Sequence, residues 1–157
     1  MILDERTEFC DATACNTGAA GTYLLGDQID LGAVNNIGTT DGLYLVITVD
    51  TGIKVASGTG TIQFKLASDD SASIATNGTA TEHYLTPAIA TSTTSDAGAL
   101  AAGKVLAAVK LPQGFNYERY LGILQVTGTT AISAGKINAF LTSDITLWAA
   151  YDSPSQA

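Results

Sequence analysis

A series of short apolar segments separated by turn residues constrains this chain most. Residues 61–66 alternate strictly, with Ile62, Phe64 and Leu66 on one side and polar residues between them. A period of two places one face of a β-strand in a core. Residues 43–49 are apolar on both faces and rich in β-branched side chains, which is typical of a central strand covered on both sides. The chain is therefore expected to be built from strands.

Further strand-like segments follow in the C-terminal half. Residues 120–126 and 136–142 flank a connector rich in Gly and Thr, and we expect these two segments to form an antiparallel pair. Residues 104–110 indicate another strand, preceded by a loop. Residues 145–150 are expected to form either a last short strand or a packed tail.

Turn residues punctuate the chain at short intervals, and this spacing predicts an all-β fold, an antiparallel β-sandwich of jelly-roll type. A length of 157 residues suits one domain. We expect residues 1–157 to form a single jelly-roll-like domain with two additions. One is an N-terminal arm at about residues 1–15, with one or two helical turns between 4 and 14. The other is a long excursion from the sheet, rich in Thr and Ser, at about residues 68–95.

The composition favours assembly with other subunits. Hydrophobic residues make up 46% of the chain but charged residues only 14%, against about 25% in an ordinary soluble domain. Thr, Ser, Gly and Ala take the place of charged residues, and a surface of these residues costs less to desolvate. The net charge of −8 has the wrong sign for neutralising phosphates. We therefore expect no nucleic acid partner.

The N-terminal residues are acidic where a signal peptide requires a basic region followed by an apolar run. The longest strongly apolar stretch, residues 43–49, is far shorter than the roughly 20 residues that a membrane-spanning helix needs. We expect synthesis in the cytoplasm without export, and no membrane partner.

Candidate catalytic groups are few. His83 is the sole histidine, and no Gly-x-Ser-x-Gly motif accompanies it, so we interpret it as a surface or interface residue rather than part of a hydrolase. Asp69 and Asp70 are adjacent and would face opposite ways on an extended chain, which favours an Asx turn over a pair of catalytic carboxylates. We expect no enzyme and no catalytic residue, and a glycosidase using Asp69 or Asp70 is the enzymatic alternative.

Cys10 and Cys15 are the only cysteines. A bridge between them would close a very small loop, and nothing else in the chain indicates an oxidising compartment, so we expect free thiols. Two cysteines and one distant histidine do not make a tetrahedral set of ligands. We expect neither a metal nor another cofactor.

Residues 117–120 place Arg119 between Tyr117 and Tyr120. An arginine between aromatic rings suits stacking and pairing with a carboxylate. Such a cluster either anchors a partner or orders the start of a strand, and the sequence favours neither.

Stretches spread over the chain together resemble the capsid cement proteins of short-tailed phages of the Bordetella phage type. The matching positions are Met1, Ile2, Leu3, Asp4, Phe9, Asp11, Ala12, Asp30, Leu31, Gly32, residues 64–66, Ser68, Asp69, Asp70, Leu111, Pro112, Gly114, residues 118–121, residues 126–129 and residues 135–137. Their order and spacing agree over roughly residues 1–142. Residues 68–95 and the segment after Asp144 align poorly with that family.

This resemblance implies a jelly-roll fold and a homotrimer on the exterior of the capsid of a virion, made in the host bacterial cytoplasm. The homotrimer would bind the outer surface of the assembled head and bridge neighbouring copies of the major capsid protein. The runner-up is a carbohydrate-binding or adhesive β-sandwich module of a phage particle, followed by a tail or head-completion protein.

An apolar N-terminus frays unless something covers it. We therefore expect Ile2, Leu3 and Phe9 to dock onto a neighbour or a sister subunit. Tyr117, Arg119 and Tyr120 are the other candidate interface residues.

Overall fold

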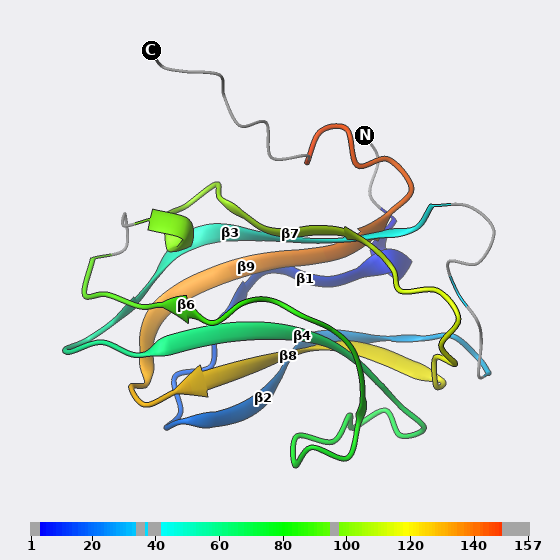
Figure 1. Cartoon of the computed structure of the whole chain (residues 1–157), viewed down its shortest axis with the longest axis horizontal. Helices are drawn as coiled ribbons and strands as arrows, with labels where there is room; N and C mark the ends of the chain where they lie inside the picture. The colour runs from blue at the N-terminus through cyan, green and yellow to red at the C-terminus, as the bar shows by residue number, and fades with distance from the viewer. Residues whose placement is uncertain (1–3, 34–36, 38–41, 95–97, 149–157) are drawn as a thin grey trace.

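Two antiparallel β-sheets stacked face to face make up this protein, as Figure 1 shows. The computed structural model describes residues 4–33, 37, 42–94 and 98–148. One layer, here called the β3 sheet, contains β1 (Glu8–Ala14), β9 (Ile132–Thr142), β3 (Tyr44–Val55) and β7 (Val105–Lys110), in that spatial order. The other layer, the β4 sheet, contains β2 (Gly21–Asp30), β8 (Tyr120–Gly128), β4 (Thr61–Asp69) and β5 (Thr81–Leu85).

Three short elements complete the described chain. They are β6 (Ile89–Ala90), which also pairs with β4, and the 3-10 turns η1 (Glu5–Thr7) and η2 (Gly98–Leu100). Among the described residues, no helix has the length and apolar character needed to cross a membrane.

The order of strands identifies the fold type. Each sheet alternates strands from the two halves of the chain, so that β9 lies between β1 and β3, and β8 lies between β2 and β4. Two stacked sheets with four long strands each, interleaved in this way, form a jelly roll, and the short β6 is an addition to the β4 sheet. The predicted fold class, an antiparallel β-sandwich of jelly-roll type, is confirmed.

Both strands with the clearest sequence patterns lie where the pattern predicts. Ile62, Phe64 and Leu66 of β4 all point into the core, with 0% of their surface exposed. The apolar run at residues 45–49 is buried in β3, which lies between β9 and β7 within its sheet. The strand expected at residues 104–110 is β7.

The predicted antiparallel pairing of residues 120–126 with 136–142 is wrong. Both segments are strands, but β8 pairs with β2 and β4, whereas β9 pairs with β1 and β3. The short connector after Gly128 therefore crosses from one sheet to the other. Turn residues between two strands indicate a reversal of direction, but they do not reveal whether the second strand stays in the same sheet.

Most of the predicted N-terminal arm is a strand of the sandwich. Only η1 is helical, and the side chain of Asp4 caps it by accepting a hydrogen bond from the Arg6 amide at 3.0 Å. From Glu8 onward the chain pairs with β9, and Phe9 and Cys10 are each 1% exposed. The correction follows from burial, because two consecutive apolar side chains gain more inside the core than on an arm.

The C-terminal expectation of a strand or a packed tail resolves in favour of the tail, as far as the chain is described. Residues 146–148 form a turn, and the Trp148 ring packs edge-on against Phe140 with centroids 5.0 Å apart. Residues 149 and 150 lie outside the described residues.

The predicted excursion at residues 68–95 is only partly outside the sheets, because β5 and β6 both pair with β4. The remaining loop folds over the outer face of the β4 sheet, where Ile74 packs with Ala67, Ala80 and Leu124. Ile74 is 2% exposed. The sequence prediction overlooked this anchor.

Asp69 holds the start of that loop. Its carboxylate accepts hydrogen bonds from the backbone amides of Ser71 at 3.0 Å and Ala75 at 2.9 Å. These bonds lower the pKa of Asp69, the bond from Ala75 most. The Asx turn predicted at this position is confirmed.

Candidate interaction surface

The two long margins of the sandwich differ in how they are closed. At one margin β1 and β2 touch through their backbones. Gly26 of β2 has a φ of +64°, and a Cβ atom at this position would lie 1.9 Å from the carbonyl oxygen of Phe9. The pairing of β2 with β8 shifts register between Leu25 and Ile29, and such a bulge bends a strand. The bend at Gly26 seals this side of the core.

The opposite margin is open. Here β7 and β5 are the outer strands of their sheets, and β7 pairs with β3 alone among the described strands. A groove of about 420 Å³ runs along this margin, lined by residues 105–109 of β7 together with Tyr84 and Ile145. We call it the β7 groove. Every lining side chain is apolar or aromatic.

A second hollow of about 440 Å³ continues the β7 groove at Val105, where small residues around η2 leave space. Lys104 precedes β7 and Lys110 ends it, and both are exposed. Neither lysine forms an ion pair with another residue that the structure describes. An unpaired apolar strand edge is a surface that proteins usually cover or protect with charge.

The closed margin is acidic. Glu5, Glu8, Asp11 and Asp27 line a hollow of about 340 Å³ beside β1. Partial burial, with the charges of Asp11 and Glu5, raises the pKa of Glu8. Within the described part of the chain, no group of His, Cys, Asp and Glu side chains is placed to hold a metal ion. The two margins of the sandwich thus differ in charge as well as in shape.

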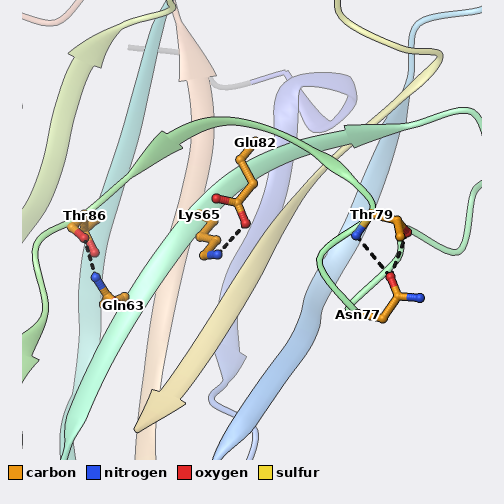
Figure 2. A network of polar contacts seen from close by, with 6 residues as sticks. All are labelled: Gln63, Lys65, Asn77, Thr79, Glu82 and Thr86. Carbon is orange, nitrogen blue, oxygen red and sulfur yellow. Dashed lines mark hydrogen bonds and ion pairs between the residues drawn. The ribbon is translucent and has the colours of Figure 1, made fainter.

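Part of the outer face of the β4 sheet is polar, and Figure 2 shows side chains of this part and of the neighbouring loop with their partners. The Gln63 amide donates to the carbonyl oxygen of Thr86 at 3.2 Å, and Lys65 forms an ion pair with Glu82. In the loop above, Asn77 accepts hydrogen bonds from the Thr79 amide at 3.1 Å and the Thr79 hydroxyl at 2.7 Å. This face is therefore a poorer docking surface than the β7 groove.

Two of the six candidate interface residues are core residues. Tyr117 is 0% exposed, and its hydroxyl donates to the carbonyl oxygen of Pro112 at 2.7 Å. Burial raises the pKa of Tyr117 to about 12. Phe9 is 1% exposed within its own chain. Neither side chain needs a partner from another subunit, because the core of its own chain already covers it.

Arg119 orders a junction between strands. Its guanidinium donates to both carboxylate oxygens of Asp30 at 2.9 Å, and it lies 5.0 Å from the centre of the Tyr120 ring. The Arg119 carbonyl oxygen also accepts from the Leu31 amide at 2.8 Å. The hydrogen bond from Arg119 is the main cause that lowers the pKa of Asp30 to about 2. These contacts tie the end of β2 to the start of β8, while Ile2 and Leu3 lie outside the described residues.

His83 belongs to a buried polar cluster. Its Nε2 atom lies 2.7 Å from the Ser68 hydroxyl, which also accepts from the Glu118 amide at 3.1 Å. The imidazole stacks on the Tyr117 ring with centroids 4.0 Å apart, and burial lowers the pKa of His83. Ser68 is 0% exposed, so a substrate could not reach its hydroxyl. The geometry therefore describes a structural pair rather than a hydrolytic one.

Cys10 and Cys15 are free and buried. Burial is the largest cause that raises the pKa of each thiol to about 12. Both cysteines are consequently neutral, unreactive parts of the core.

The fold and this surface together define a class, a jelly-roll β-sandwich with one sealed acidic margin and one open apolar margin. A family model described as Bbp16 matches residues 9–141. The chain therefore belongs to the Bbp16 family, a phage-related family whose designation stands for a Bordetella phage protein. A search of curated proteins found no match.

Proposed function

We propose that this chain is a capsid cement protein of a phage head. It binds the outer surface of the assembled head as a homotrimer and bridges neighbouring copies of the major capsid protein. Membership in a phage-related family supports the proposal, as does the small share of charged residues. The observation that carries it is the open margin along β7, an apolar edge that favours contact with another subunit.

The stabilising effect follows from mass action. A protein that binds the assembled lattice, and not its free subunits, shifts the equilibrium toward the lattice. Three linked copies also bind more tightly than one, because the first contact raises the effective concentration of the other two. This function requires no catalytic residue, metal or cofactor.

The test uses heads assembled without this chain, which are mixed with the purified protein and sedimented. We expect the protein to sediment with heads but not with unassembled major capsid protein, and to raise the temperature at which the heads open. Absence of binding at concentrations far above micromolar would refute the proposal. Binding to a panel of glycans without binding to heads would instead favour the carbohydrate-binding module.

A further inference from the structure

The β7 groove needs an occupant, and the N-terminal segment of the chain has matching chemistry. We propose that the groove receives residues 2–5 of a second copy of this chain. Ile2 and Leu3 enter the apolar groove, and the carboxylates of Asp4 and Glu5 meet the lysine at one end of it. This contact rests on the proposed cement function and names the interaction that joins the copies.

Charge and polarity make the groove selective. Its lining contains no acidic side chain, and Lys104 and Lys110 flank β7 at its two ends. In contrast, Lys65 and Arg119 are already paired with acids of their own chain. Lys104 and Lys110 remain available to an acidic ligand, because neither is paired with another described residue.

The N-terminal segment carries the complementary pattern over four consecutive residues. Ile2 and Leu3 are apolar, and Asp4 and Glu5 follow directly. Two copies of a chain with a net charge of −8 repel each other over most of their surfaces. A lysine-flanked groove is the kind of site at which they attract.

The position of β1 indicates that the β7 groove is filled by the N-terminal segment of a neighbouring copy rather than by that of its own chain. Glu8 lies beside Phe140, which lies beside Val46, which lies beside Ala108 of β7. Three spacings between strands amount to about 14 Å. The chain between Glu8 and Asp4 is folded as the 3-10 turn η1, which lies against β9, so only the two residues from Asp4 to Ile2 can extend further, by about 7 Å. The groove lies beyond β7, on the side facing β5, so a segment from the β1 margin of another copy is better placed to fill it.

The contact would join two different surfaces, the segment at the β1 margin of one copy and the groove at the β7 margin of the next. Such heterologous contacts close into rings when the rotation between copies permits. A ring of three fills every groove, in agreement with the homotrimer of the proposed function.

The direct test is a cysteine cross-link between Leu3→Cys and Ala108→Cys in one chain. The natural cysteines do not interfere, because both are buried with pKa values of about 12. After mild oxidation we expect covalent oligomers up to a trimer on a denaturing gel without reductant. Each single substitution serves as a control and should give no trimer.

Other occupants of the groove give different products. A bridge within one chain, seen as a monomer of altered mobility, would overturn the proposal in favour of the chain's own segment. Bridging of Ser153→Cys with Ala108→Cys, without bridging from Leu3→Cys, would assign the groove to the C-terminal segment and overturn it as well.

A second measurement does not depend on disulfide geometry. We expect Ile2→Ser with Leu3→Ser, and separately Lys104→Glu with Lys110→Glu, to weaken self-association about tenfold or more. Lys54→Glu with Lys136→Glu is the matched control, since it changes the net charge equally on β3 and β9. Light scattering gives the mass, and urea unfolding verifies that each variant folds. Unchanged association of the first two variants would refute the contact.

The same variants separate this contact from the cement function. If the wild-type chain is monomeric in solution, the cross-link is repeated on decorated heads. Heads that bind the chain but give no cross-link between Leu3→Cys and Ala108→Cys would refute the groove contact and leave the cement function standing. A cross-linked trimer that never binds heads would refute the cement function and leave the groove contact standing.

Discussion

Gly26 is the position where the packing of β1 against β2 can be tested most directly. Its left-handed backbone would cost an alanine roughly 1–2 kcal/mol. The new methyl group would also lie 1.9 Å from the Phe9 carbonyl oxygen and 2.7 Å from the Cys10 sulfur. Separating two packed strands to make room typically adds about 1–3 kcal/mol. We expect Gly26→Ala to lower the free energy of unfolding by about 2–5 kcal/mol in total, a large share of the 5–15 kcal/mol that is typical of a domain.

Gly58→Ala is the matched control. Gly58 also has a left-handed backbone, with a φ of +72°, but a Cβ atom there would meet nothing within 4 Å. Urea unfolding of both variants and the wild type, followed by tryptophan fluorescence and circular dichroism, gives the free energies at unchanged slope. If Gly26→Ala proved no more destabilising than Gly58→Ala, the two strands would not be in backbone contact, and the description of a sealed margin would be wrong.

Two further predictions concern buried ionisable groups. Burial lowers the pKa of His83 below 6.5, so the unfolded chain binds a proton more readily than the folded chain. The contribution of neutral His83 to the free energy of unfolding is complete above pH 6.5, and it declines as the pH falls below this value. We expect His83→Asn to reduce this decline in urea titrations, and an identical pH dependence in both proteins would contradict the reasoning. For Cys10 and Cys15 we expect no reaction with a thiol reagent in the folded protein and two reactive thiols per chain in urea. Rapid labelling of the folded chain would show that the thiols are not buried.

Local sequence patterns predicted where the strands lie along the chain, but not which strands pair with each other. The alternation around Phe64 requires burial of one face of a strand, and the run around Ile47, which is apolar on both faces, requires burial of two. Neither requirement depends on which strands lie alongside. The pairing of β8 with β2 and of β9 with β1 brings together residues about a hundred positions apart. No turn signal encodes such a pairing, and this is why the expected hairpin was wrong.

Ile74 shows how a buried position escapes a periodic pattern. It stands among small and polar residues, so it belongs to no recognisable strand or helix face. Its burial depends on Gly122 of β8, where a Cβ atom would lie 2.5 Å from the Ile74 side chain. The space for Ile74 is therefore determined by a residue from a distant part of the chain.

The candidate surface was predicted only in part. The sequence indicated a strand at residues 104–110, but its position at the edge of the β3 sheet depends on the whole topology. Arg119 was singled out in the sequence, yet its partner Asp30 could be identified only once β2 and β8 lay side by side. Phe9 was placed on an arm because an apolar N-terminus frays unless something covers it, whereas its burial in the sandwich depends on pairing of β1 with β9.

The placement of the two late strands has a consequence for synthesis. β8 and β9 come last along the chain, and each occupies an interior position in its sheet. A nascent chain therefore lacks the centre of both layers until Thr142 has been made. At about 5–20 residues per second, the earlier strands wait for several seconds with apolar edges exposed. Folding of this jelly roll is thus expected to follow translation rather than accompany it, and rapid production of many copies would depend on chaperones that protect unfinished chains.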